Sequence, residues 1–205
     1  MLFDDTYKTI SSASEGIYKE KGSKFIAYAF PVKTEAEIKA HIEKLKKEHH
    51  AARHHCYAYR LHPDKSVYRM NDDGEPSGTA GKPIYGQIQS NDLTNVLIVV
   101  VRYFGGTLLG MSGLIKAYRN AAIDAICNAT IIEETINDIY RVTCNYDHQN
   151  DVLKIIKQEN LKIISNQSEN KFMITFEVRK NKAEKVITGI NLIQNCEIKF
   201  IGNAN

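Results

Sequence analysis

The sequence contains no apolar run that approaches the length of about 18 residues needed for a membrane-spanning helix. Its first residues, MLFDDTYK, carry acidic side chains where a secretory signal needs a basic start followed by an apolar segment. The cysteines form no C-x-x-C pair, so reduced thiols are favoured over disulfides or a zinc site. We therefore expect a cytoplasmic protein without a membrane segment. The four scattered cysteines are Cys56, Cys127, Cys144 and Cys196.

The chain also has little excess charge. Its formal net charge of +3 argues against a protein that coats nucleic acid through bulk charge. The distribution is uneven, because residues 19–60 hold ten Lys or Arg against five Glu, with five His in addition. This segment is either a basic edge suited to RNA or another acidic partner, or the solvated face of a helix.

The common motifs of nucleotide-hydrolysing enzymes and serine hydrolases are missing. The glycines of residues 105–113 do not spell G-x-G-x-x-G, and no G-K-[ST] follows them. Ser77 and Thr79 lie outside any G-x-S-x-G elbow, and nothing in the sequence activates them. Cys56 shares a predicted strand face with His54, but a buried and inert thiol is the better interpretation. We expect no catalytic residue and no cofactor.

The rest of the chain is organised around Asn95–Asn128. The β-branched run Val96–Val101 predicts a strand buried on both faces. Gly105 and Gly106 then end this strand, and we expect a helix capped by Ser112. The glycine-rich turn and the helix N-terminus are suited to an anion, although the glycines serve equally well for a tight turn. The helix carries small residues that permit close packing, at Ala117, Ala121, Ala122 and Ala125.

Other elements precede this unit. Ser23–Val32 and Arg53–Leu61 have the apolar and aromatic composition of strands, and Ser66–Met70 is expected to pair with the second of them. Between the first two lies a predicted amphipathic helix, Thr34 to Glu48, which opens with the capping box TEAE. The polar segment Asn71–Lys82 is predicted to be a long irregular loop, which is more often functional than accidental.

After a boundary at residues 129–135 the pattern changes to the order βαββαβ, which is the ferredoxin-like pattern. This part has no glycine-rich loop and no cluster of acids or histidines, so we expect it to pack or bind a partner. The predicted strands are Ile136–Asn145, Leu161–Ser165, Lys171–Arg179 and Cys196–Ile201, and the predicted helices are Gln149–Gln158 and Asn181–Ile190.

Two groups of residues are candidates for binding. Asp72, Asp73 and Glu75 supply oxygens for a divalent cation, although short loops also use Asp to bond their own backbone. Cations and aromatics beside the glycine-rich turn provide a surface for RNA or phosphate. Two alternatives remain open for this second group. Its aromatic residue Tyr103 and the neighbouring Phe104 could belong to the core, and Arg102 could pair with Asp73 or Glu75. Its members are Arg102, Tyr103, Lys116, Tyr118 and Arg119.

The segments GSKFIAYAFPV, ARHHCYAYR, NDDGEPSGTAGKPI and NVLIVVVRYFGGTLLGMSGLIKAYRNAA, in this order, resemble the YigZ/IMPACT family over roughly the first 130 residues. The chain departs from the family pattern at Ser112 and at Lys116, but it keeps a small residue and a positive charge there. The resemblance implies a first domain of the ribosomal-protein-like α+β fold shared with domain IV of elongation factor G. It also implies the additional ferredoxin-like domain of bacterial members, and a role in translation, which eukaryotic members regulate.

We therefore expect an α+β protein with an IMPACT/YigZ N-terminal domain at residues 1–133, an α/β sandwich, and a ferredoxin-like domain at 136–205. The predicted function is a non-enzymatic, translation-linked regulator that binds RNA, the ribosome or a translation factor, without a metal. The alternatives are a metal- or phosphate-dependent hydrolase that uses the Asp72–Gly81 loop, and a purely protein-binding regulator. The predicted binding residues are Asp73, Glu75, Ser77, Thr79, Arg102, Tyr103, Gly105, Gly106, Lys116, Tyr118 and Arg119.

Overall fold

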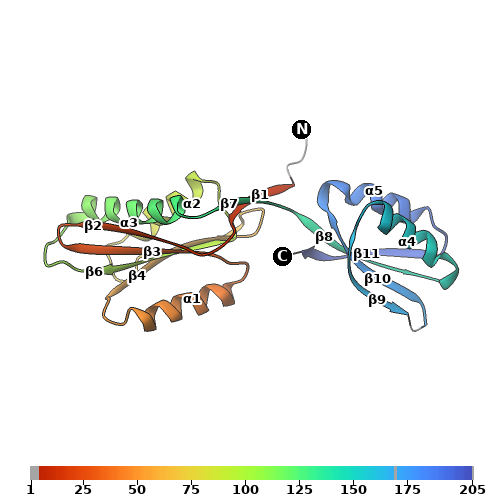
Figure 1. Ribbon diagram of the computed structural model, residues 1–205, viewed down its shortest axis with the longest axis horizontal. Coiled ribbons are helices and arrows are strands. Elements are labelled where there is room, and N and C mark those ends of the chain that lie inside the picture. Colours follow the sequence, from red (N-terminus) through yellow and green to blue (C-terminus); the bar gives the residue numbers. More distant parts are fainter. Residues whose placement is uncertain (1–4, 169, 205) are drawn as a thin grey trace. The chain divides into compact units, whose positions relative to one another are not determined.

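The structure, a computed structural model, describes residues 5–168 and 170–204 of the 205-residue chain. Its contacts divide these residues into two units, Tyr7–Glu134 and a second unit of residues 5–6 with 135–204 (Figure 1). Both units combine helices and strands, so the expected α+β class is confirmed. The domain boundaries at residues 133 and 136 stay a prediction. No helix within the described ranges is long and apolar enough to cross a membrane.

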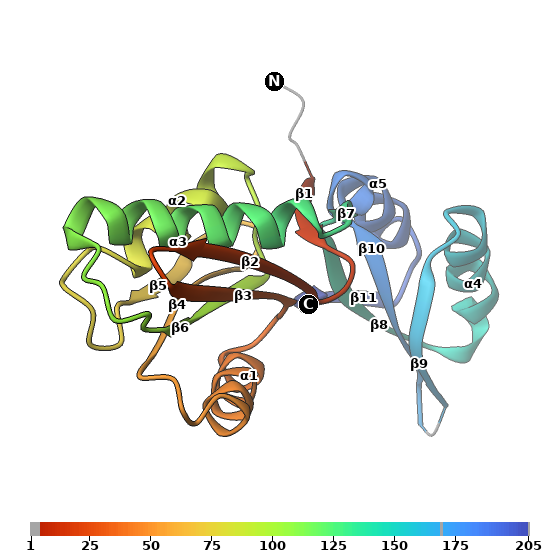
Figure 2. The same cartoon turned by 60° about the vertical axis from the view of Figure 1, so that its left-hand side comes forward.

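The N-terminal unit is built on a five-stranded sheet in which neighbouring strands are antiparallel. Helix α1 (Glu35–Glu48) covers one face of this sheet, and α2 (Gly81–Ser90) with α3 (Gly110–Cys127) covers the other (Figures 1 and 2). In order across the sheet, the strands are β2 (Ser14–Glu20), β3 (Ser23–Pro31), β6 (Val96–Tyr103), β4 (His54–Leu61) and β5 (Val67–Asn71). A separate two-stranded sheet joins β1 (Thr6–Ile10) to β7 (Ile131–Thr135).

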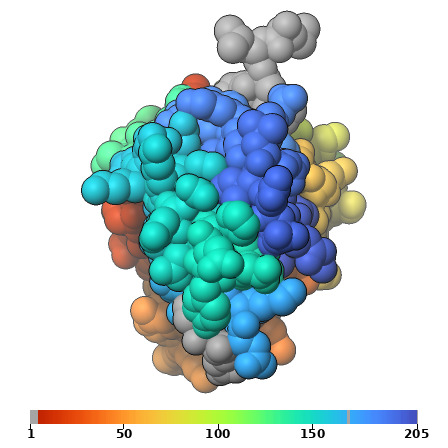
Figure 3. Space-filling view, turned by 90° about the vertical axis from the view of Figure 1, so that its right-hand side faces the viewer, coloured from red at the N-terminus to blue at the C-terminus, as the bar shows by residue number. Residues whose placement is uncertain are grey.

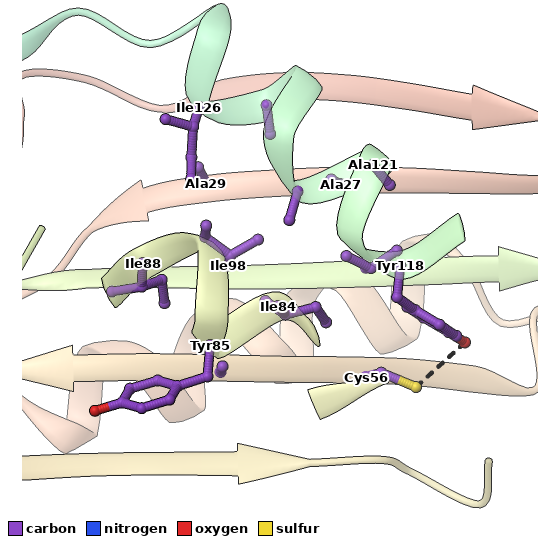
Figure 4. Close-up of a cluster of buried hydrophobic side chains, with 14 of the residues drawn as sticks. Ala27, Ala29, Cys56, Ile84, Tyr85, Ile88, Ile98, Tyr118, Ala121 and Ile126 are labelled. Carbon is purple, nitrogen blue, oxygen red and sulfur yellow. Dashed lines mark hydrogen bonds between the residues drawn. The ribbon is translucent and has the colours of Figure 1, made fainter. Parts of the chain in front are cut away.

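Strand β6 is the centre of this sandwich. All side chains of Val96–Val101 are fully buried, which confirms the predicted strand with two covered faces. Because side chains alternate along a strand, Ile98 and Val100 enter the core under α2 and α3, and Val99 and Val101 enter the core under α1. Figure 4 shows the first of these cores, in which Ile84 and Ile88 of α2 lie against the sheet.

Helix α3 lies directly on the backbone of β2. A Cβ atom added to Gly16 would lie only 2.2 Å from the backbone nitrogen of Ala125. The contact is fixed by two hydrogen bonds: the Ser14 hydroxyl donates to Ala125 O at 2.8 Å, and the Ile17 amide donates to a carboxylate oxygen of Asp124 at 2.7 Å. The alanines predicted to permit close packing are fully buried at this interface or beside it.

The second unit has a four-stranded antiparallel sheet in the order β11-β8-β10-β9. Its elements follow one another as strand, helix, strand, strand, helix, strand, and the side chains of both helices join those of the sheet in one core. A 3-10 turn, Tyr146–His148, precedes the first helix. The elements are β8 (Asn137–Cys144), α4 (Gln149–Gln158), β9 (Lys162–Ser168), β10 (Phe172–Arg179), α5 (Lys180–Asn191) and β11 (Cys196–Ala204).

The structure corrects two expectations in the N-terminal unit. Helix α3 begins at Gly110 rather than after a Ser112 cap, and its N-terminus has no side-chain cap. The chain enters the helix through Gly110, whose φ of +71° is accessible to glycine, so Ser112 already lies inside the first turn and not at its cap. The loop predicted for Asn71–Lys82 is shorter than expected, since Gly81 already belongs to α2. Sequence patterns missed α2 together with β1, β2 and β7.

Sequence patterns did not predict helix α2, because the side chain that accepts hydrogen bonds from its N-terminal amides lies eight or nine residues earlier in the sequence. The carboxylate of Asp72 accepts hydrogen bonds from the backbone amides of Ala80 and Gly81 at 3.0 and 2.8 Å. These are donors that a helix N-terminus leaves without a partner in the helix. Pro83 is tolerated because it lies in the first turn, where its missing N–H removes no helical hydrogen bond. The capping box of α1, by contrast, is local: the Thr34 hydroxyl accepts from the Glu37 amide at 3.2 Å.

The turn after β6 depends on Gly105. Its amide donates to the Ser23 hydroxyl at 3.1 Å, and an added Cβ atom would lie 1.9 Å from the carbonyl carbon of Gly22. We expect Gly105→Ala to destabilise the chain by more than about 2 kcal/mol, because two backbone segments must separate. Gly86→Ala is the matched control, since Gly86 of α2 has no neighbour within 4 Å of its added Cβ, and it should be neutral or stabilising. Urea unfolding followed by circular dichroism measures both, and equal midpoints would contradict the prediction.

The second unit is held to its own N-terminal segment by the buried carboxylate of Asp5. Arg179 donates two hydrogen bonds of 2.7 Å to Asp5, and this guanidinium holds the pKa of Asp5 below its usual value. A depressed pKa stabilises the fold above the unfolded-state pKa of about 3.9, and this contribution disappears as the pH falls further. Asp5→Asn should therefore be less stable than the parent at pH 7, and the difference should shrink below about pH 4. Unfolding curves between pH 7 and pH 3 test this, and a constant difference would count against it.

Candidate functional site

A cavity of ≈ 870 Å³ opens where β6 ends, at one end of the sheet in the N-terminal unit. Five segments line it: the residues before and at the start of β4, the loop after β5, the end of β6, the connection into α3, and the beginning of α3 itself. The lining is mainly apolar, with few charged side chains. The lining residues used below are Arg53, His54, Glu75, Arg102, Phe104, Leu108 and Met111.

The floor of the cavity is a buried ion pair. The Arg102 guanidinium donates to Glu75 Oε1 at 2.6 Å, and the Tyr118 hydroxyl donates to the same oxygen at 2.7 Å. Of the two acids that the sequence offered to Arg102, the structure therefore selects Glu75. Both members of the pair are more than nine-tenths buried. The guanidinium carbon lies 5.5 Å from the ring centres of Phe25 and Phe104, and Arg102 Nε has no hydrogen-bond partner among the described residues.

The network continues into the core. The Cys56 thiol lies 3.3 Å from the Tyr118 hydroxyl (Figure 4) and 2.9 Å from the carbonyl oxygen of Asp72. Burial raises the pKa of the Cys56 thiol and of the Tyr118 hydroxyl. Both groups are therefore protonated at neutral pH, so Tyr118 donates a hydrogen bond and Cys56 is an unreactive thiol. This is the buried, inert cysteine that the sequence favoured.

Asp72 shapes the loop between β5 and α2. Besides the two amides of α2, its carboxylate accepts from the Gly78 amide at 2.9 Å. The Glu75 amide in turn donates to the carbonyl oxygen of Asp72 at 2.9 Å. The Thr79 hydroxyl is buried and donates to Pro76 O at 2.6 Å. The loop is therefore held by its own hydrogen bonds, and these hold Glu75 beneath Arg102.

Asp73 turns away from this network toward α1. Its carboxylate accepts from the His55 amide at 2.7 Å and lies 3.6 Å from the Lys46 ammonium. Its carbonyl oxygen accepts from His54 Nδ1 at 2.8 Å. Burial lowers the pKa of His55, whose Nε2 has no hydrogen-bond partner in the described part of the chain. Asp72, Asp73 and Glu75 thus have separate partners, and the described residues hold no group of three or more His, Cys, Asp or Glu placed for a metal ion.

The structure joins three predicted site residues, Glu75, Arg102 and Tyr118, by hydrogen bonds, and Tyr103 lines the same cavity as Glu75 and Arg102. Tyr103 is half-buried, and its hydroxyl lies 2.8 Å from Nδ1 of His49. The two glycines differ, because Gly105 is packed on Gly22 whereas Gly106 has open space and a φ of +87°. Both glycines are exposed, as are the predicted residues Ser77, Lys116 and Arg119, and Lys116 lines a smaller depression with Lys21.

Sequence reasoning missed the apolar rim of the cavity. Phe104, which was considered a possible core aromatic, is 56% exposed, and Leu108 and Met111 are 83% and 62% exposed. The available signal was the presence of large apolar side chains in a segment already interpreted as a glycine-rich turn. Arg53, also exposed, adds a positive charge to the lining.

Comparison with known proteins matches residues 21–126 to the family described as the Impact N-terminal domain. IMPACT family member YvyE of Bacillus subtilis (strain 168) is 36% identical over 141 residues, which are 69% of this chain and 65% of YvyE. The matched part thus spans just under two-thirds of that relative. IMPACT family member YigZ of Escherichia coli (strain K12) is 36% identical over 147 residues, which are 71% of this chain and 72% of YigZ.

A crystal structure described only as that of a hypothetical protein is 28% identical, with a TM-score of 0.74 over 97% of both chains. The matched family domain takes up more than half of the 205 residues, and it includes the conspicuous β6–α3 unit and the loop that carries Glu75. The resemblance inferred from the sequence is confirmed: the chain belongs to the IMPACT family.

Proposed function

We propose that this chain is a non-enzymatic, translation-linked regulator that binds RNA, the ribosome or a translation factor through the rim of the cavity in its N-terminal unit. Membership of the IMPACT family supports the role in translation that the resemblance implies. The observation that carries the proposal is the exposure of Phe104, Leu108 and Met111 around one opening.

Exposed large apolar side chains that gather in one place mark interaction sites more often than scattered ones do. Phe104 and Leu108 come from the connection between β6 and α3, Met111 comes from the first turn of α3, and all three line the same cavity. Aromatic and methionine side chains are also those that interfaces use preferentially. The rim therefore has the composition of a contact surface.

Several exposed cations lie on the cavity lining or on elements next to it. Arg53 lines the cavity itself, and Lys21 and Lys116 line the adjoining depression, where Glu20 is the one acidic neighbour among its lining residues. Arg119 is exposed and lies three residues after Lys116, so both project from one side of α3. Cations beside an aromatic ring suit a phosphate backbone with unstacked bases, or an acidic protein surface.

The buried groups support a structural role rather than a catalytic one. Glu75 is neutralised by Arg102, Asp72 is occupied by backbone amides, and burial keeps Tyr118 and Cys56 protonated. This leaves the hydrolase alternative without an observation in its favour. The apolar rim does favour the purely protein-binding alternative, and a nuclease-insensitive complex with one protein would select it.

We also propose the finer folds that the sequence suggested. The five-stranded sandwich is taken as the ribosomal-protein-like fold of elongation factor G domain IV, and the strand order β11-β8-β10-β9 supports a ferredoxin-like second domain. Residues 1–133 and 136–205 are the corresponding domains, in a cytoplasmic protein.

The proposal is tested by sedimenting the full chain with ribosomes and with ribosomal RNA at low and moderate salt. Lys116→Ala with Arg119→Ala should weaken binding and lower the salt slope of log K by roughly 1 to 2, because about 0.7 to 0.9 is lost for each phosphate contact. Leu108→Ser with Met111→Ser should weaken binding while leaving the slope unchanged.

The control is Lys154→Ala with Lys157→Ala, which removes two exposed cations at the same spacing from α4 of the second unit. This variant should bind like the parent. If the parent sediments alone, or if both rim variants bind like the parent, the proposed surface is wrong.

The buried pair should affect stability rather than contact. Glu75→Gln leaves the Arg102 guanidinium buried without its counter-charge and should cost about 3 kcal/mol or more of unfolding free energy. The matched control is Glu43→Gln, whose exposed pair with Lys39 at 3.9 Å should contribute less than about 1 kcal/mol. Urea unfolding measures both costs, and similar values for the two variants would refute the structural role.

A further inference from the structure

Two of the four cysteines face each other across neighbouring strands of the second unit. Cys144 ends β8, Cys196 begins β11, and the antiparallel register pairs these two residues directly. Directly opposed residues of an antiparallel pair have Cα atoms about 4.5–5.5 Å apart and side chains on the same face. Disulfide-bonded cysteines usually have Cα atoms about 4.4–6.8 Å apart. The backbone is therefore already arranged for a disulfide, although both cysteines are free thiols in this structure.

The two side chains differ in access. Cys144 is buried within the core between the sheet and its helices, and Cys196 packs against the edge of that core and is half-buried. Strand β11 is an edge strand, and Figure 3 shows the last part of the chain, coloured dark blue, at the surface of this unit. One thiol is thus reachable by a small oxidant, and the other lies directly behind it.

We propose that Cys144 and Cys196 are an oxidisable pair that closes to an intramolecular disulfide when the chain meets a peroxide. The Cys196 sulfur attacks one peroxide oxygen and the O–O bond breaks, which gives a sulfenic acid and one water. The Cys144 sulfur then attacks the sulfenic sulfur, the S–S bond forms, and a second water leaves with the Cys144 proton. The pair loses two electrons, and one hydrogen peroxide is reduced to two waters.

The surroundings set the rate of this step. Burial, the hydrogen bond with Cys144 and the Asp151 carboxylate raise the pKa of Cys196 to about 12. Because the thiolate is the reactive form, the pair is slow to oxidise at neutral pH and stays reduced during brief exposure. Once formed, the disulfide ties the edge strand β11 to β8 and closes the chain between them, which stabilises the folded second unit. This inference concerns the second unit and does not depend on the proposed binding surface.

The remaining cysteines provide internal controls. Cys127 is exposed near the end of α3 in the other unit, and Cys127→Ser removes a site for bonds between molecules. Cys56 is buried beneath the Tyr118 hydroxyl, so it should remain reduced in the folded chain.

The experiment uses full-length Cys127→Ser protein, incubated with hydrogen peroxide, denatured, alkylated with iodoacetamide and examined by intact mass and peptide mapping. We expect a monomer that carries one carbamidomethyl group, at Cys56, and has lost two hydrogen atoms relative to the reduced chain. Peptide mapping should find Cys144 and Cys196 in one cross-linked peptide pair that dithiothreitol separates. The oxidised protein should unfold several degrees higher than the reduced protein. Adding Cys144→Ser should leave Cys196 to accumulate as sulfenic or sulfinic acid.

Two results would overturn the inference: Cys144 and Cys196 both alkylated after prolonged peroxide treatment, or Cys196 converted to sulfinic acid without a cross-link while Cys144 is intact. The unsubstituted chain is mapped in parallel, so the answer does not depend on how well any variant folds.

Discussion

The pairing of Glu75 with Arg102 is the interaction on which the N-terminal unit depends at the end of the sheet where β6 stops. The Glu75 carboxylate belongs to the loop after β5, the Arg102 guanidinium to the end of β6, and the Tyr118 hydroxyl to α3, so one carboxylate oxygen joins three segments that are distant in sequence. A charge removed from water needs both a counter-charge and hydrogen bonds. Here the Phe25 and Phe104 rings cover the guanidinium, which leaves these partners as its main compensation. The position of the connection between β6 and α3 follows from this requirement.

Sequence patterns located the elements whose signals are local. The buried run Val96–Val101 and the capped helix that follows Thr34 were predictable because burial and capping act over a few residues. Helix α2 was not predictable, because its N-terminal amides are held by Asp72, which lies eight and nine residues earlier in an irregular loop. The start of α3 was misplaced because a general preference for Ser caps was applied to a helix whose cap position is Leu109, three residues before Ser112, and which has no side-chain cap.

The sequence identified residues of the candidate site, but it did not determine what each of their side chains does. The sequence offered Glu75, Arg102 and Tyr118 as binding residues and left open a pairing of Arg102 with Asp73 or Glu75, and the structure pairs Arg102 with Glu75 and buries all three side chains. Periodicity does not reveal this distinction, because whether an arginine is covered depends on rings contributed by β3 and by the turn after β6. The same limitation hid the rim: Phe104 follows directly on a buried strand, and nothing local distinguishes an aromatic that continues the core from one that leaves it.

The exposure of Phe104, Leu108 and Met111 therefore requires a physical cause, because free apolar side chains tend to collapse onto the nearest core. The structure blocks this collapse at both ends of the connection. Gly105 is fixed against the backbone of Gly22 and Ser23, and Leu109 lies so close to the first turn of α3 that a Cβ atom at Gly113 would be 2.9 Å from the Leu109 Cβ. Leu108 lies between these two points and stays exposed, and the Phe104 ring lies over the Arg102 guanidinium of the buried ion pair. Binding costs free energy when it orders a mobile segment, and a segment that is already fixed in the free protein loses less conformational entropy. A fixed backbone therefore favours the proposed binding even through a small contact surface.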